Sequence, residues 1–283
     1  MVENIDSKAI ENNVHEGMDS LHQMLLYMLT ELERVSHITG LRYFLTYGTL
    51  IGAVRERSLI GWDVDADVFV PVDDYDALCT ALSSLLPSDL CVYSPLSVPN
   101  YEYTFARIGY RGIDHKIVRV DLIPLGSGPR RQTARIAYSL YVRFVNLFYM
   151  LKLVPLEEKI HYGFRKKLIT RFAKAVLALI PSPLLLSGVT WIRRKRFAGR
   201  TLADSCGWFG PRRQFFDADW FANTTRVELG DQLFNGPSGA HRFLEWVYGD
   251  YMNPVSAEEQ EKQLRFAHRY YLTPLRQMGV IAN

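Results

Sequence analysis

Residues 41–70 read LRYFLTYGTLIGAVRERSLIGWDVDADVFV, and this stretch decides the fold. Residues 41–47 are aromatic and apolar, which is typical of a buried strand. Gly48 and Thr49 follow, and then residues 50–57, whose apolar spacing and charged end predict a helix. A strand that passes through a glycine and a hydroxyl residue into a helix presents free backbone N–H groups to an anion. We therefore expect Gly48 and Thr49 to bind a phosphate group.

Three aspartates at a spacing of two residues follow this turn: Asp63, Asp65 and Asp67. Because side chains at i and i+2 share one face of a strand, Asp65 and Asp67 would project together. The apolar residues between and after them would face the core: Ala66, Val68 and Val70. Neighbouring carboxylates repel each other unless a cation lies between them. The pattern predicts a site for Mg²⁺, with Mn²⁺ as an alternative, beside the phosphate-binding turn.

Two other interpretations of the aspartates stay open. An EF-hand calcium loop also begins with alternating acids, but it needs glycine at its sixth position and glutamate at its twelfth. Counted from Asp63, these positions hold Val68 and Asp74. An exposed acidic strand edge would explain the aspartates, although it would not explain the Gly48-Thr49 turn before them.

A further carboxylate lies in the apolar run VRVDLIPL, residues 118–125. A lone acid in such a strand, here Asp121, is costly unless it coordinates something. A glycine turn, paired aspartates and then a single strand aspartate is the order found in nucleotidyltransferase-fold enzymes. We predict that the catalytic and metal-binding residues are Asp65, Asp67 and Asp121.

These motifs resemble those of the LicD family of phosphocholine transferases, which includes the fukutin-type ribitol-phosphate transferases. The resemblance rests on YGTLIGAVR at 47–55 and WDVDAD at 62–67. This chain has Gly61 where the family commonly has proline, and Val64 where it commonly has a second aspartate. The good match covers about residues 41–125.

Three shorter stretches resemble other motifs of the family: FARI at 105–108, VDLIPL at 120–125 and, more loosely, YGDYMNP at 248–254. In the reaction that the resemblance implies, Arg55 and Arg107 would bind the donor phosphates or nucleotide together with Gly48 and Thr49. Asp63 and Trp62 would support the site, with Asp63 orienting a metal-bound water.

The resemblance implies a CDP-activated donor, with CDP-choline first and CDP-ribitol or a related alcohol next. The acceptor would be a sugar hydroxyl of a cell-surface glycan, such as lipopolysaccharide or teichoic acid, or its lipid-linked precursor. Two alternatives remain: an enzyme that transfers a nucleoside monophosphate, and a non-catalytic protein that binds nucleotide or glycan. The three aspartates argue against the last, because a binding module has little use for such costly carboxylates.

The net charge of +3 hides an uneven distribution. Residues 129–200 contain sixteen Lys and Arg against two acids, a charge of +14, so the remainder carries −11. Eighteen residues without a charge, 175–192, are broken by Pro181 and Pro183, which predicts two short apolar helices rather than one membrane span. Residues 161–200 would suit a membrane surface, unless the cations are simply solvated or bind the donor. No nucleic-acid-binding module accompanies them.

The predicted fold class is α+β: a small mixed nucleotidyltransferase-like sheet flanked by helices. We expect a catalytic core in residues 1–128 that begins with a helix over 14–39, a basic helical insertion in 129–200, and a C-terminal helical part in 201–283, packed as one unit. A polar N-terminus without an apolar segment predicts no signal peptide, and unpaired cysteines suit a reducing compartment: Cys79, Cys91 and Cys206. These features predict a cytoplasmic protein, or one peripheral to the inner face of the plasma membrane.

Overall fold

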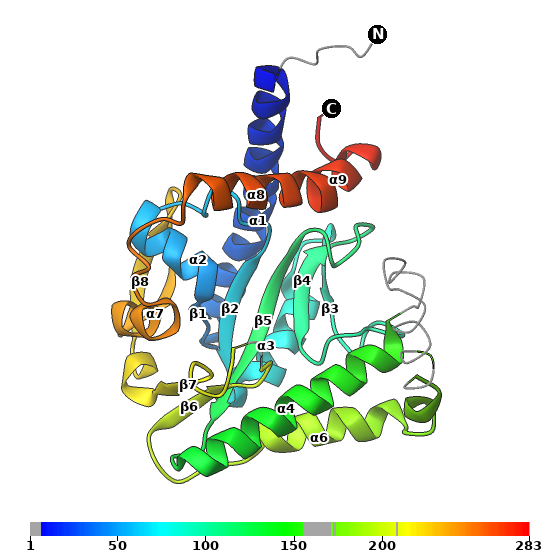
Figure 1. Cartoon of the computed structure of the whole chain (residues 1–283), viewed down its shortest axis with the longest axis vertical. Coiled ribbons are helices and arrows are strands. Elements are labelled where there is room, and N and C mark those ends of the chain that lie inside the picture. The colour runs from blue at the N-terminus through cyan, green and yellow to red at the C-terminus, as the bar shows by residue number, and fades with distance from the viewer. Residues whose placement is uncertain (1–6, 155–170, 172–173, 208, 283) are drawn as a thin grey trace.

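The computed structural model describes residues 7–154, 171, 174–207 and 209–282. Within them, a mixed sheet of seven strands forms the middle of the molecule, and helices lie around it (Figure 1). A hairpin of two further strands forms a second, small sheet. The fold is therefore α+β, as the sequence predicted.

The strands have the following bounds: β1 Phe44–Leu45, β2 Ala66–Pro71, β3 Leu90–Tyr93, β4 Ala106–Tyr110, β5 Arg119–Ser127, β6 Thr201–Asp204, β7 Phe215–Asp217, β8 Thr224–Leu229 and β9 Gln232–Pro237. The large sheet is built around β2 and β5, which run parallel. Its other pairs are antiparallel, in the order β1-β2-β5-β4-β3, with β6 on the far end of β5 and β7 on β6. Strands β8 and β9 form the hairpin.

The α-helices have these bounds: α1 Ser7–Thr39, α2 Tyr47–Ile51, α3 Val72–Leu85, α4 Gln132–Leu153, α6 Ser182–Arg194, α7 Ala240–Tyr248, α8 Ala257–Ala267 and α9 Thr273–Gln277. Shorter helical turns lie at η1 Gly52–Glu56, η3 Ala218–Phe221 and η4 His268–Leu272. Helices α1 and α3 pack on each other and against the sheet, while α2 packs on β2 and α7. Helix α8 crosses α1 at the upper end of the molecule (Figure 1).

The apolar spacing that predicted the first helix is confirmed. Helix α1 buries Leu21, Leu25, Leu29 and Leu32 completely. It stops before Gly40, whose φ of +69° is the left-handed conformation of a C-cap glycine. The prediction that alternate residues of β2 face the core is also confirmed, because these three are at most 1% exposed: Ala66, Val68 and Val70.

The predicted strand and helix boundaries around Gly48 are wrong by several residues. Strand β1 covers only Phe44–Leu45, and α2 already begins at Tyr47, so Gly48 and Thr49 lie in the first helical turn rather than in a turn before it. Tyr47 has a φ of +47°, which no strand residue adopts. The Tyr47 ring is buried against Phe69, and its hydroxyl donates to Asp204 Oδ2 at 3.0 Å. These two contacts fix the position of Tyr47, the residue at which the chain leaves the strand.

Two further parts of the chain contain strands whose bounds the sequence did not predict. Strand β4 begins only at Ala106, and residues 101–105 before it form no strand. Residues 201–283, expected as a C-terminal helical part, also contribute the strands β6 to β9. Strand β6 takes the antiparallel place beside the exposed end of β5, from Leu125 to Ser127, where it completes the backbone hydrogen bonds of that strand.

The three predicted parts do not have three separate cores. One hydrophobic core runs from α1 through the sheet to α7, η4 and α9. Helices α4 and α6 pack against β6 and β7 through a second, smaller cluster: Tyr138, Val142, Ile192, Ala203 and Phe215. Part of the predicted membrane segment, 161–170, lies outside the described residues. In the described part of the chain, no helix combines the length and the apolar character that crossing a membrane would need.

Candidate active site

The strand register places three predicted site residues in one row. Asp67 of β2 is the partner of Asp121 of β5, and Asp121 is in turn the partner of Arg107 of β4. Partner residues in neighbouring strands project from the same face of a sheet. The fold therefore brings together a carboxylate, a second carboxylate and a guanidinium that are up to 54 residues apart in the sequence.

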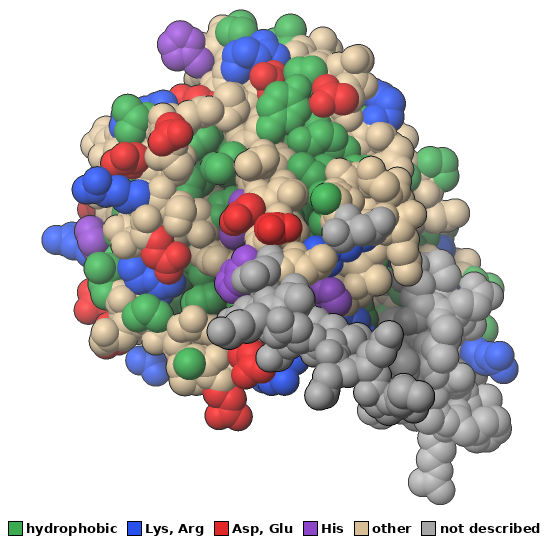
Figure 2. All heavy atoms as spheres, turned by 90° about the horizontal axis from the view of Figure 1, so that it is seen from above, with side chains coloured by type: hydrophobic (Ala, Val, Ile, Leu, Met, Phe, Trp, Pro, Cys, Tyr) green, Lys and Arg blue, Asp and Glu red, His purple; other side chains and the backbone are tan. Residues whose placement is uncertain are grey.

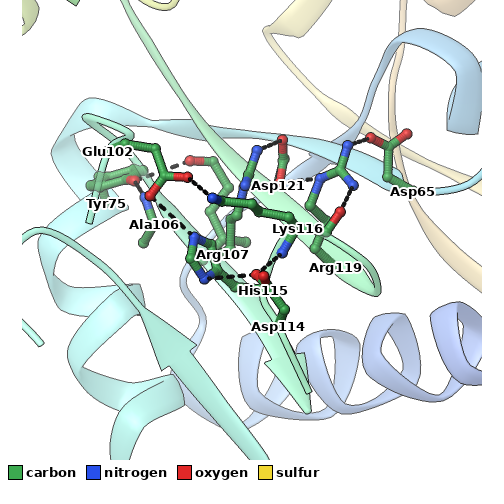
Figure 3. Close-up of polar contacts among 11 residues, drawn as sticks. Asp65, Tyr75, Glu102, Ala106, Arg107, Asp114, His115, Lys116, Arg119 and Asp121 are labelled. Carbon is green, nitrogen blue, oxygen red and sulfur yellow. Dashed lines mark hydrogen bonds and ion pairs between the residues drawn. The ribbon is translucent and has the colours of Figure 1, made fainter. Parts of the chain in front are cut away.

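Two arginines hold the central carboxylate of this row. Arg107 Nε lies 2.7 Å from Asp121 Oδ1, and Arg107 Nη2 donates to Oδ2 at 3.2 Å. Arg119 is two residues before Asp121 on β5 and shares its face; its Nε lies 3.5 Å from Asp121 Oδ1. Arg119 also forms an ion pair with Asp65, so it bridges two of the predicted metal ligands (Figure 3). The sequence prediction missed Arg119, although its period-two spacing from Asp121 was visible.

Asp67 has no such counter-charge within hydrogen-bonding distance. Its Oδ1 is buried and has no hydrogen-bond partner among the described residues. Burial raises the pKa of Asp67 well above its ordinary value, and the nearby carboxylates of Asp65, Asp121 and Asp63 raise it further. The neighbouring Arg107 is only 2% exposed, and its Nη1 likewise has no partner among these residues. Buried polar atoms are rarely left unpaired, so Asp67 Oδ1 and Arg107 Nη1 are the atoms that a bound ligand would contact.

The start of α2 contacts the aspartate loop closely. The Thr49 hydroxyl accepts a hydrogen bond from the Asp67 N–H at 2.8 Å, which ties the helix to β2. A Cβ on Gly48 would lie 2.5 Å from Asp63 Oδ2, so only glycine leaves room for that carboxylate. Asp63 is partly buried; desolvation and then the Asp65 charge raise its pKa well above the ordinary value. Gly48 and Thr49 thus shape the carboxylate site, and their contact with phosphate stays a prediction.

Polar side chains extend the row beyond Arg107. The guanidinium of Arg107 stacks on the Tyr103 ring, with 3.5 Å from Cζ to the ring centroid. Near it, Glu102 is ion-paired with Lys116, at 3.0 Å from Nζ to Oε1, and its Oε2 lies 3.5 Å from His115 Nε2 (Figure 3). Burial would raise the pKa of Glu102, but hydrogen bonds from His115 and Lys116 lower it to about 2. The sequence prediction did not include these residues.

Two tyrosines of the C-terminal helices also reach the site. Burial raises the pKa of the Tyr248 hydroxyl, and the next causes are the charges of Asp67, Asp63 and Asp65. The Tyr271 ring lies 5.9 Å from Arg119 Cζ. Tyr248 opens the YGDYMNP stretch at 248–254, whose loose resemblance to a family motif did not single out this tyrosine. Tyr271 carried no local signal in the sequence.

The remaining predicted residues have structural contacts. Arg55 Nη1 donates to the Tyr251 carbonyl at 2.8 Å, and the same guanidinium pairs with Glu56. Trp62 is partly buried against the main core. His22 of α1 lies 2.9 Å from the Asp63 carbonyl, which can only accept, so Nε2–H donates. A role for Arg55 in donor binding stays a prediction.

The donor atoms can be tested for their fit to a metal ion. Among the described residues, no group of three or more His, Cys, Asp or Glu side chains is arranged to hold one. The facing pair Asp67 and Asp121, with Asp65 just before β2, supplies hard oxygen donors, among them Asp67 Oδ1, which has no hydrogen-bond partner in the described part of the chain. Mg²⁺ is commonly bound by one or two carboxylates, with substrate phosphates and water completing its shell. These oxygen donors are of the kind that Mg²⁺ binds, and a magnesium ion at this site stays a prediction.

Comparison with known proteins agrees with this geometry. The chain is 25% identical over 263 residues to the lipopolysaccharide cholinephosphotransferase LicD of Haemophilus influenzae, which covers 82% of this chain and 91% of the relative. The family model described as LicD/FKTN/FKRP, nucleotidyltransferase domain, matches residues 40–139, which include β1 to β5. Residues 40–139 of this chain are therefore similar to the nucleotidyltransferase domain of the LicD/FKTN/FKRP family.

Proposed function

We propose that this protein transfers a phospho-alcohol group from a CDP-activated donor to a sugar hydroxyl of a cell-surface glycan or its lipid-linked precursor. We expect CDP-choline to be the donor, with CDP-ribitol as the next candidate. The observation that carries the proposal is the row Asp67, Asp121 and Arg107 on three neighbouring strands. The Haemophilus relative, which is named as a lipopolysaccharide cholinephosphotransferase, supports the choice of choline and of a glycan acceptor.

In this reaction the acceptor hydroxyl attacks the phosphorus atom that bears the alcohol. A new bond forms between that phosphorus and the sugar oxygen, the bond to the bridging oxygen of the pyrophosphate breaks, and CMP leaves with that oxygen. The hydroxyl proton must go to a base. The products are the phosphorylated sugar and CMP.

The three residues of the row and their neighbours Asp65 and Arg119 would have distinct parts in this transfer. Asp65 and Asp67 would hold Mg²⁺, which would supply neutralising charge to the pyrophosphate. Asp121 would complete the metal site or accept the proton from the sugar hydroxyl. Arg107 has a free, buried Nη1 among the described contacts, and it would stabilise charge on the phosphoryl oxygens. Arg119 would do the same once its pairing with Asp65 gives way to the metal.

The test is CMP release from a panel of CDP-alcohols with Mg²⁺ and simple sugar acceptors. We expect magnesium-dependent CMP from one donor, and mass spectrometry should find the phospho-alcohol on the sugar. EDTA should stop the release. CMP release that is indifferent to EDTA would contradict the metal assignment, and a sugar carrying CMP would contradict the reaction type.

Ordinary nucleotidyl transfer is the second candidate, because the matching family model is described as a nucleotidyltransferase domain. The two functions differ in their leaving group. Transfer of a nucleoside monophosphate from a triphosphate releases pyrophosphate, whereas the proposed reaction releases CMP. Pyrophosphate release from CTP in the presence of a sugar acceptor would favour this second candidate.

A further inference from the structure

Helix α4 has an outer face that the rest of the described chain leaves exposed. Large apolar side chains on it are 37–52% exposed: Ile136, Leu140, Tyr141, Phe144, Leu147 and Phe148. Their spacing of three and four residues places them along one side of the helix. The opposite side is buried and includes Tyr138, Val142 and Tyr149. Both sides of this helix are therefore apolar, and one of them is exposed.

Helix α6 continues this surface. The two helices lie side by side at the lower end of the molecule (Figure 1). The Tyr141 hydroxyl of α4 donates to the Gly188 carbonyl of α6 at 3.2 Å, and the Tyr141 and Trp191 rings are 6.2 Å apart. On α6 and just before it, Leu179, Leu184 and Trp191 are 84%, 61% and 56% exposed. We call the exposed apolar residues of α4, α6 and residue 179 the α4–α6 surface.

The charged residues of α4 and α6 have one sign. Neither α4 nor α6 contains an acidic residue. Exposed cations lie on or next to the helices, including Arg131 and Arg143. Lys195 Nζ lies 4.7 Å from the centre of the Trp191 ring, at the end of α6. Arg194 and Arg196 are paired with Asp76 and Asp73 of α3, so part of the positive charge is already compensated.

The opposite end of the molecule differs. Figure 2 shows the face at the upper end of Figure 1, where acidic, basic and histidine side chains lie between apolar ones. A mixed face of this kind is typical of a solvated surface. A contiguous apolar surface on two helices whose charged residues are all cations instead indicates an interaction site.

We propose that the α4–α6 surface binds an anionic lipid membrane, with both helices lying in the plane of the interface. Apolar side chains would enter the acyl boundary and the cations would contact lipid phosphates, which is how interfacial helices bind. Trp191 and the tyrosine beside it suit the headgroup level. A two-fold dimer through this surface is disfavoured, because it would bring the cations of one copy against those of the other.

The surface lies next to the candidate active site. A cavity of about 290 Å³ is lined by Leu147 and Arg143 of α4 on one side and by Glu102 and Tyr103 on the other. Leu147 belongs to the α4–α6 surface, and Tyr103 stacks on Arg107 of the site. This step rests on the proposed function: a lipid-linked acceptor held in the membrane would meet the protein beside its catalytic residues.

The test is co-sedimentation of the full chain with lipid vesicles, which needs no activity. We expect the protein to pellet with vesicles of phosphatidylcholine and phosphatidylglycerol, and much less with phosphatidylcholine alone or in high salt. The double variant Leu140→Gln/Phe144→Gln should lower the partition coefficient by about tenfold or more. Both side chains are already half exposed, so the fold should tolerate the change.

Leu233→Gln/Phe266→Gln is the matched control. These side chains are 53% and 48% exposed, against 50% and 52% for the tested pair, and they lie on β9 and α8. Unchanged binding by the control supports the proposal, and equal binding by both double variants overturns it. A wild-type dimer in analytical ultracentrifugation that Leu140→Gln/Phe144→Gln disrupts would also overturn it. CMP release with a soluble acceptor is measured without vesicles, so failure of either proposal is seen separately.

Discussion

At the scale of single residues, the site keeps an arrangement that costs folding free energy. Asp67 is partly buried, its buried Oδ1 has no hydrogen-bond partner among the described residues, and it faces Asp121 across a strand pair. An unpaired buried carboxylate is expensive, and neighbouring carboxylates add repulsion. Cores do not retain such groups for stability, so the cost is best explained by a reaction that needs them.

Asp67→Asn should therefore separate activity from stability. We expect CMP release to fall by about 100-fold or more, the usual effect of removing one group that stabilises transition-state charge. The free energy of unfolding should stay the same or rise by roughly 1 kcal/mol, because a neutral amide removes the repulsion. Urea denaturation and turnover measure the two effects. Asp231→Asn, an exposed turn position, is the control and should leave both unchanged.

Arg107→Gln should have the opposite effect on stability. The change leaves Asp121, only 1% exposed, without its closest cation. Removing one partner of a buried ion pair costs about 3–5 kcal/mol. The double variant Arg107→Gln/Asp121→Asn should recover much of that loss, since no charge is then left unpaired. Additive effects of the two single substitutions in urea denaturation would show that the pair is not coupled.

At the scale of elements, period-two and helical spacing predicted which residues of β2 and α1 face the core. Irregularities of the backbone were not predictable. The period-two alternation predicted that Ala66, Val68 and Val70 face the core, as the structure has them, while β2 begins only after Asp65. The start of α2 could not be placed, because a left-handed Tyr47 is set by tertiary burial and by its bond to Asp204. The strand register, which pairs Asp121 with Asp67, also depends on contacts that no local pattern encodes.

Gly48→Ala should perturb the site from within a helix. Alanine would favour the helix itself by up to about 1 kcal/mol. Its Cβ would lie 2.5 Å from Asp63 Oδ2, however, so the carboxylate must move. We expect a net loss of stability of roughly 1–3 kcal/mol and a lower turnover. Gly61→Ala is the control, because nothing lies within 4 Å of the added Cβ. Equal effects of the two substitutions would contradict the packing argument.

The contact between α1 and the aspartate loop should make stability depend on pH. Burial lowers the pKa of His22 below its ordinary value of 6.5. The unfolded chain then binds a proton more readily than the folded one, so this contribution is present above about pH 6.5 and is lost as the pH falls. His22→Gln keeps a donor for the Asp63 carbonyl but cannot titrate. Between pH 7.5 and 5, wild type should lose more stability in urea than this variant, and parallel losses would contradict the assignment.

At the scale of the whole molecule, the candidate site is assembled from the N-terminal sheet and the C-terminal helices. The motifs in residues 41–125 predicted the carboxylates and Arg107. They did not predict Tyr248 or Tyr271, because these arrive from α7 and η4, more than a hundred residues later. The common hydrophobic core explains why the termini cannot be separated from the catalytic part. The basic insertion was expected to be helical, and its described part has α4 and α6, whose exposed apolar faces only the packing reveals.

Tyr271→Phe tests whether the C-terminal helices contribute to the reaction. The ring that faces Arg119 remains, and only the hydroxyl is removed. We expect a loss in turnover of about threefold to tenfold, the scale of one hydrogen bond, with unfolding hardly affected. Tyr270→Phe is the matched control, since this neighbour is 48% exposed. Equal kinetics of both variants would show that Tyr271 only packs.

The central claim, that the row of Asp67, Asp121 and Arg107 performs phospho-alcohol transfer, is tested most directly by one assay. Wild type, Asp67→Asn and Asp231→Asn are each incubated with CDP-choline, Mg²⁺ and a sugar acceptor, and CMP and free phosphocholine, the leaving group of nucleotidyl transfer, are both measured. The account predicts CMP without free phosphocholine from wild type and Asp231→Asn, and about 100-fold less CMP from Asp67→Asn. Release of CMP by Asp67→Asn at the wild-type rate would contradict the account.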